Sequence, residues 1–122
     1  MGQTELIAND PTADSPQLCV ELWVSLASLL RSYTAAHGLN GKRQATVELG
    51  EDRILVRHGD DWLDLNRIDA TVMWQREDGR QGTLEFTEHG RLRKMGTDEA
   101  GEEEMDMAAE RWARDLMREP QQ

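Results

Sequence analysis

The 122-residue chain has few of several residue types, and each scarcity excludes a class of protein. Its single cysteine, Cys19, cannot form an intrachain disulfide, which excludes a disulfide-stapled secreted scaffold. No apolar run approaches the ~20 residues that cross a bilayer, and nothing near Met1 has the basic start and apolar stretch of a secretion leader. We therefore expect a cytoplasmic protein with no membrane segment.

Motifs that specify a chemistry are also missing. The chain contains no GxSxG nucleophile elbow, no P-loop and no GxGxxG dinucleotide fingerprint. Cys19 falls on the apolar side of a predicted helix, where a thiol is expected to be structural. Runs of adjacent acids are typical of solvated faces rather than of the separated carboxylates that acid–base catalysis requires. We therefore predict no catalytic residue and no cofactor.

Lysine is scarce as well, and the chain is acidic. Its 24 acidic and 14 basic side chains give a net charge of −10, of which −1 lies in residues 39–94 and −6 in residues 95–122. Binding to phosphate backbones or to an anionic membrane needs a basic stripe, which this balance disfavours. The one dense basic cluster in the sequence is Arg91, Arg93 and Lys94, which defines a nucleic-acid-binding alternative.

The apolar content, 38%, is sufficient for one core in a chain of this length. Residues 1–14 contain few large apolar side chains and a turn-forming Asn-Asp-Pro sequence, so we expect a mobile N-terminal arm there. A single domain is expected over 15–119, followed by a short tail over 120–122.

The first predicted helix follows the arm. Ser15 is a favourable N-cap, Pro16 suits the first helical position and Gly38 suits a stop, so the helix is predicted from Pro16 to about His37. Its polar residues form one narrow stripe, and apolar residues fill most of the circumference. A helix with so broad an apolar surface is buried on more than one side. We expect a sheet on one side and a second helix or a second subunit on the other.

Between residues 42 and 94 the apolar period becomes two, which is typical of half-buried strands. The pattern predicts strands over 45–49, 53–57, 62–65, 71–76 and 83–87, with a short last strand near Leu92. Asp78-Gly79 is the strongest hairpin signal in the chain. The segment 66–69 fits either a bulge inside one long strand or a real turn.

A second amphipathic helix is predicted to start between Asp98 and Glu102 and to end before Pro120. In this interpretation the three acids at 102–104 occupy its first turn, where carboxylates interact favourably with the helix dipole. The element order predicts an α+β fold: an antiparallel meander sheet of four to six strands, with the N-terminal and C-terminal helices packed on one face.

All three histidines precede a glycine at a predicted chain reversal. If the two central strand segments form one long bulged strand, His37, His58 and His89 gather at one edge of the sheet, with Asp60 beside them. Imidazoles together with a carboxylate are ligands for a divalent metal, so a metal-binding protein or small metal-dependent enzyme is one alternative function. If the chain instead turns between the two segments, His58 and His89 fall at opposite ends and this hypothesis fails.

The predicted function is that of a non-enzymatic protein-interaction module, and five residues are candidates for its interface. Trp62 stands beside a turn, Met107 and Met117 lie partly off the apolar face of the last helix, and Glu103 and Glu104 belong to the acidic segment. Trp is enriched at interfaces, and Met adapts to varied partners. Because the first helix is apolar on almost two sides, we expect the partner to be a second copy, in a homodimer, or another protein.

Overall fold

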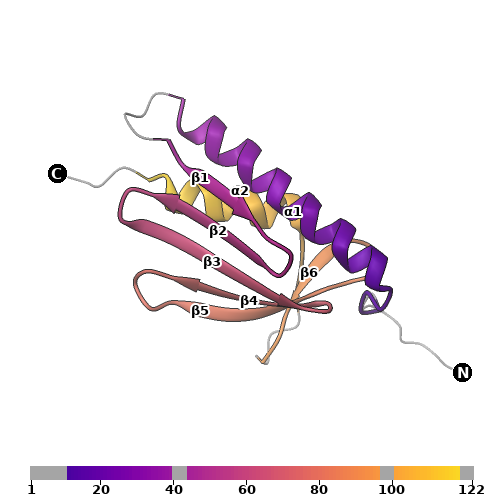
Figure 1. Cartoon of the computed structure of the whole chain (residues 1–122). Helices are drawn as coiled ribbons and strands as arrows, with labels where there is room; N and C mark the ends of the chain where they lie inside the picture. Colours follow the sequence, from indigo (N-terminus) through magenta and orange to yellow (C-terminus); the bar gives the residue numbers. More distant parts are fainter. Residues whose placement is uncertain (1–10, 40–43, 97–100, 119–122) are drawn as a thin grey trace, which may run out of the picture.

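The computed structural model describes residues 11–39, 44–96 and 101–118, which form an α+β fold (Figure 1). Within these residues two helices and seven strands occur, and each strand pairs antiparallel with the next to give a continuous meander. The elements are α1 (Pro16–His37), β1 (Thr46–Leu49), β2 (Arg53–His58), β3 (Asp61–Ile68), β4 (Thr71–Arg76), β5 (Gln81–Phe86), β6 (Arg91–Lys94), β7 (Glu102–Glu104) and α2 (Met105–Leu116). The predicted class is confirmed, with one strand more than the four to six expected. In the described part of the chain, neither helix combines the length and apolar character that a membrane crossing requires.

The first helix begins and ends where its flanking residues predict. The Ser15 side chain accepts a hydrogen bond from the Leu18 amide at 3.3 Å, Pro16 occupies the first turn, and the chain leaves the helix at Gly38. On its buried face, the indole of Trp23 donates to a backbone carbonyl in the turn between β1 and β2 at 3.2 Å. This hydrogen bond attaches the N-terminal half of α1 to the edge of the sheet.

The chain turns sharply at Asp69 and Ala70, and this decides between the two interpretations of that segment. β3 and β4 pair directly, with Ile68 opposite Thr71, and Asp69 has a positive φ of 54°. Asp is among the residues that adopt this left-handed conformation at low cost. The long bulged strand is therefore wrong, and β3 and β4 are separate antiparallel strands.

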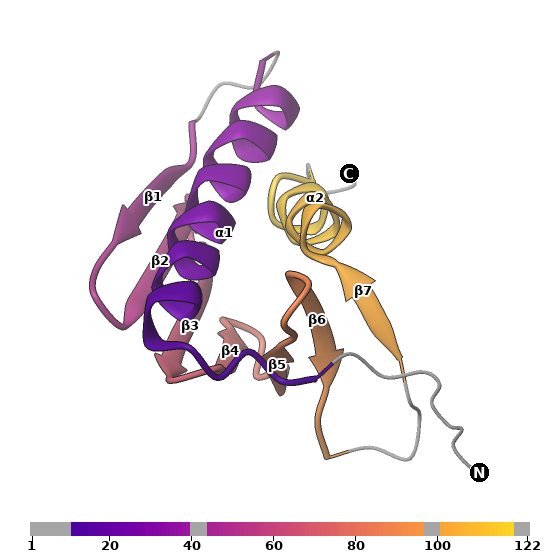
Figure 2. The ribbon, with the colours of Figure 1, turned by 90° about the vertical axis from the view of Figure 1, so that its right-hand side faces the viewer.

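The sheet has one covered face and one open face. Figure 2 shows both helices on the covered side, lying next to each other, with the sheet curving around them. Because side chains alternate along a strand, every second residue of β2 to β6 points into the core. These core residues include Ile54, Val56, Leu63, Leu65, Val72, Leu84, Phe86 and Leu92.

Part of the segment expected to be a mobile arm is held against the sheet. The Ala13 amide donates to the Phe86 carbonyl at 3.0 Å, and the Ala13 side chain is buried. Residues 11–14 therefore pack with the folded domain. Residues 1–10 of the expected arm and the expected tail at 120–122 lie outside the described residues.

The acidic segment at 102–104 is not the first turn of a helix, as the sequence suggested, but strand β7. It pairs with β6, and α2 begins only after it. The cause is tertiary: Arg93 lies 3.1 Å from Glu102 and Arg91 lies 3.0 Å from Glu104, measured between nitrogen and carboxylate oxygen. Ion pairs across two strands thus replace the expected interaction with the helix dipole.

The second helix covers the other side of α1, so much of the broad apolar surface of α1 is buried within one chain. Two polar contacts also join the helices. The Tyr33 hydroxyl donates to the Asp106 carboxylate at 2.7 Å, and His37 Nε2 lies 3.0 Å from a Glu110 carboxylate oxygen. Small side chains let helices approach closely. The buried small residues of the two helices include Ala27, Ala108, Ala109 and Ala113.

Enlarging one of these alanines should destabilise the fold. Ala109 is fully buried, so Ala109→Leu overpacks the core and is expected to lower the free energy of unfolding by about 1–3 kcal/mol. Ala35→Leu, on the exposed side of α1, is the matched control and should change it by less than about 0.5 kcal/mol. Urea unfolding followed by circular dichroism measures both variants, and equal effects would contradict tight packing at Ala109.

Candidate functional site

The helices leave one end of the covered sheet face only partly filled. A hollow of about 570 Å³ lies there, between the strands β4 to β7 and the helix α2. We call it the apolar hollow. Its apolar lining includes Trp74, Leu84, Leu92, Met95 and Trp112, and its polar lining includes Lys94, Glu103 and Arg111. Volumes of this size are typical of sites that take a small ligand or a few side chains of a partner.

Two indoles form one wall of the apolar hollow. The rings of Trp74 and Trp112 lie 6.3 Å apart between centroids, tilted by 60°, which is a favourable aromatic arrangement. Trp74 reaches this position because its strand neighbour is Gly82. A Cβ atom at Gly82 would lie 2.6 Å from Trp74 Nε1, so any side chain there would displace the indole. The glycine therefore contributes directly to the shape of the hollow.

Two cations stand at the same hollow. The Arg111 guanidinium lies over the Trp112 ring, 5.7 Å from its centroid, and donates to Glu103 at 2.6 Å. Lys94 lies on the same sheet face as Leu84, its register partner in β5. Its ammonium group forms no ion pair with any residue in the described part of the chain. Lys94 is thus available to bind an anion that enters the hollow.

A second hollow of about 230 Å³ adjoins the first along α2. We call it the arginine hollow, because five of its eight lining residues are arginines. They are Arg76, Arg80, Arg111, Arg114 and Arg118, and the lining is completed by Trp74, Trp112 and Asp115. The two hollows share Trp74, Arg111 and Trp112. We call the two hollows together the α2 groove.

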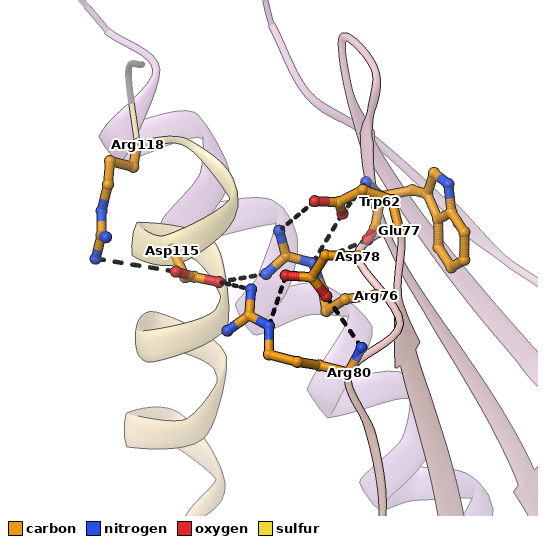
Figure 3. Close-up of polar contacts among 7 residues, drawn as sticks. All are labelled: Trp62, Arg76, Glu77, Asp78, Arg80, Asp115 and Arg118. Carbon is orange, nitrogen blue, oxygen red and sulfur yellow. Dashed lines mark hydrogen bonds and ion pairs between the residues drawn. The ribbon is translucent and has the colours of Figure 1, made fainter. Parts of the chain in front are cut away.

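A buried guanidinium, that of Arg76, lines the arginine hollow, and Figure 3 shows its contacts. The Arg76 side chain is only 5% exposed, and it ends β4 on the core side of the sheet. It donates through Nε to the Trp62 carbonyl at 3.0 Å and to Glu77 at 3.1 Å, and through Nη1 to the Asp115 carboxylate of α2. A buried charge is tolerated only with such partners. One side chain thus joins β3, the β4–β5 hairpin and α2.

The carboxylate of Asp115 is shared by three arginines. Besides Arg76, it accepts a hydrogen bond from Arg80 at 3.2 Å and lies 3.9 Å from Arg118 (Figure 3). Burial alone raises the pKa of Asp115, but the hydrogen bonds and positive charges of Arg76 and Arg80 lower it below its ordinary value. Burial also raises the pKa of Glu77, but its hydrogen bonds from backbone amides and from Arg76 outweigh burial and lower this pKa below its ordinary value. Both groups are therefore held ionised.

The structure does not bring the three predicted metal-ligand histidines together. Because the chain turns after β3, His58 and His89 lie at opposite ends of the sheet, and His37 contacts Glu110 of α2. Asp60 is exposed in the turn next to His58. The described residues contain no group of three His, Cys, Asp or Glu side chains that could hold a metal ion. The metal-site hypothesis is therefore wrong, because it required a long bulged strand that does not form.

The predicted interface residues are scattered over the molecule. Trp62 is partly exposed on the open face of the sheet, and Met107 is largely exposed on α2. Met117, by contrast, is buried at the end of α2 against Gly38, so its side chain is not available to a partner. The two acids of the set lie on β7, where Glu103 pairs with Arg111 and Glu104 with Arg91.

The basic cluster of β6 is divided between the two faces of the sheet. Arg91 and Arg93 point to the open face, where they pair with acids of β5 and β7, whereas Lys94 points to the covered face. The three cations therefore do not form the single basic surface that the nucleic-acid alternative assumed.

Sequence reasoning missed the α2 groove. No local pattern singles out Trp74 or Trp112, and in the sequence Lys94 falls in one basic cluster with Arg91 and Arg93. One signal was available: Arg111, Arg114 and Arg118 are spaced i, i+3 and i+7, which places them on one side of a helix.

No family model, curated protein or solved structure matches this chain. The α2 groove must therefore be interpreted from its own chemistry.

Removing the carboxylate of Asp115 should weaken the fold. Asp115→Ala leaves the buried Arg76 with fewer partners and is expected to lower the free energy of unfolding by about 2–4 kcal/mol. Asp60→Ala removes an exposed turn carboxylate as the control, and an effect within about 0.5 kcal/mol is expected. Urea unfolding at neutral pH compares them, and similar losses for the two variants would contradict a structural role for Asp115.

The lowered pKa values of Asp115 and Glu77 also predict how stability depends on pH. A carboxyl group whose pKa is lower in the folded than in the unfolded chain stabilises the folded state at pH values above its pKa in the unfolded chain, about 4. This stabilisation is lost as the pH falls through the pKa of the group in the folded state. We expect the free energy of unfolding to decrease below about pH 5. In Asp115→Asn this decrease should be shallower than in wild type or in Asp60→Asn, and an unchanged slope would contradict the argument.

Proposed function

We propose that this protein is a non-enzymatic protein-interaction module that holds a segment of a partner protein in the α2 groove. The observation that carries the proposal is the apolar hollow, where two indoles and aliphatic side chains line an opening in the covered face of the sheet. Aromatic side chains are the commonest anchors of protein interfaces. An apolar hollow of this volume has room for one or two such anchors.

The polar groups of the groove favour binding over catalysis. They are mainly guanidinium and ammonium groups, which hold and orient anions and remain charged at neutral pH. Among the described residues that line the two hollows there is no histidine, cysteine or serine. The three carboxylates of the lining, Glu102, Glu103 and Asp115, each pair with an arginine, so the groove offers recognition chemistry rather than an unpaired general base.

An anionic aromatic dye tests whether the apolar hollow binds ligands. Anilinonaphthalene sulfonate is expected to fluoresce with the folded protein, because its rings match the indoles and its sulfonate matches Lys94. Met95→Trp fills the opening and should weaken dye binding roughly tenfold, or by about 1.4 kcal/mol.

The control for this experiment is Met73→Trp. Met73 and Met95 are both 38% exposed, but Met73 lies on the open face of the sheet. Dye binding by the Met73 variant should equal that of wild type. The proposal fails if the folded protein does not bind the dye, or if both tryptophan variants weaken binding equally.

We further propose that the chain forms the homodimer expected from the sequence and that the two copies meet at the free edge of β1. Val20 and Val24 are about half exposed, and they lie on the side of α1 that faces β1, where Arg31 contacts the Val47 carbonyl at 3.5 Å. Leu49 of β1 is also exposed. An edge strand flanked by apolar side chains pairs readily with an identical strand across a two-fold axis.

Light scattering measures this association. The wild-type chain is expected to show the mass of a dimer, and Val24→Glu should shift it to that of a monomer, because the carboxylate would be buried at the interface. Ser32→Glu, on the exposed stripe of α1 away from Val20 and Val24, is the control and should remain dimeric. A monomeric wild type over the whole concentration range would contradict the proposed dimer.

A further inference from the structure

We propose that the occupant of the α2 groove is an acidic segment of a partner protein with an apolar or aromatic anchor. The inference rests on the proposed function and adds the chemistry of the ligand. The anchor enters the apolar hollow beside Trp74 and Trp112, and the carboxylates of the segment bind Lys94 at one end and the arginine hollow at the other. Charge complementarity carries the argument.

The lining of the groove is rich in cations on a negatively charged protein. The whole chain carries −10, yet among the described residues six cations line the two hollows against three carboxylates. The cations are Lys94, Arg76, Arg80, Arg111, Arg114 and Arg118, and the carboxylates are Glu102, Glu103 and Asp115. Local fields of this kind attract ligands of opposite charge even where the net charge is unfavourable.

The outer arginines retain the capacity to bind a further anion. Arg114 and Arg118 are 57% and 68% exposed, and each guanidinium has five N–H donors. Arg114 contacts one oxygen of Glu110 at 3.1 Å, and Arg118 lies 3.9 Å from Asp115, beyond hydrogen-bond distance. Asp115 is already shared with the buried Arg76. The acids that pair with Arg76, Arg80 and Arg114 include Glu77, Asp78 and Glu110, which lie outside the lining, so a further anion would bind through the N–H donors that these pairs leave open.

The dimensions of the groove fit a short extended segment. The residues that α2 and its C-terminal end contribute to the two hollows lie between Arg111 and Arg118, about 11 Å at the usual rise. An extended chain of about six residues, roughly 20 Å long, covers that length. Side chains two positions apart in an extended chain point in the same direction. Such a segment can therefore place an apolar side chain on the indoles and present a carboxylate two positions away on either side to the cations.

A series of short peptides tests the proposed ligand on the full chain. The first is a fluorescently labelled, acetylated and amidated peptide of about six residues with Phe at the third position, Glu at the first and fifth, and Ser elsewhere, so that anchor and carboxylates share one face when the chain is extended. The second has Gln, and the third Lys, at every Glu position. Fluorescence anisotropy is expected to show at least about tenfold tighter binding of the Glu peptide than of the Gln peptide, decreasing with added salt. The Lys peptide should bind weakest.

Two matched variants locate the charge effect. Arg114→Gln/Arg118→Gln should weaken binding of the Glu peptide roughly five- to tenfold, because exposed ion pairs contribute modestly each. Arg57→Gln removes a cation from the open face of the sheet and should leave the affinity unchanged. All three substitutions lie on exposed side chains, so the two variants are expected to fold, and their circular dichroism spectra check this.

The outcomes separate the two proposals. Equal affinity for the three peptides, or equal weakening by the Arg57 variant and the arginine double variant, overturns the acidic ligand. If, in that case, Met95→Trp still weakens dye binding and Met73→Trp does not, the proposed interaction module is supported and only the proposed acidic ligand is wrong. A single-stranded oligonucleotide that displaces the dye more strongly than the Glu peptide would also overturn the inference, because the groove would then prefer a nucleic acid.

Discussion

The arrangement of this fold depends on one buried charge. Arg76 ends β4 on the core side of the sheet, where its guanidinium has almost no access to water. Such a group must find its partners inside the protein. The Trp62 carbonyl, Glu77 and Asp115 supply them, and they belong to a strand, a hairpin and the last helix (Figure 3). The position of α2 over the sheet is therefore tied to one ionic contact as well as to apolar packing.

The candidate site is a consequence of that attachment. Asp115 already forms an ion pair with the buried Arg76. The exposed Arg80 and Arg118 therefore share a carboxylate whose negative charge is partly neutralised. Farther along α2, the indole of Trp74 lies over Gly82 and leaves a hollow that the helix only partly covers. The apolar and the basic parts of the α2 groove thus arise side by side from the same placement of one helix. Their proximity is what makes an acidic, apolar-anchored partner a specific proposal.

Strong local signals in the chain predicted much of the fold. The N-cap at Ser15, the turn at Asp78-Gly79 and the alternation of apolar residues located α1 and most of the strands correctly. The predictions from sequence failed, or stayed open, where the local signals were compatible with two different structures. Residues 102–104 satisfy the rules for a helix start, but the arginines of β6 make them a strand. The segment around Asp69 fitted a bulge or a turn equally well, and the metal hypothesis depended on that choice.

By itself, the sequence determined the class of fold, the order of its elements and the distribution of charge along the chain, because these follow from local periodicity, capping residues and composition. Only the tertiary structure decided which charges meet. It separated Lys94 from Arg91 and Arg93, and it buried Met117. It also brought Arg76 of the sheet to Asp115 of the last helix, 39 positions along the chain. Contacts between such distant residues depend on strand register and helix placement, which no local pattern encodes.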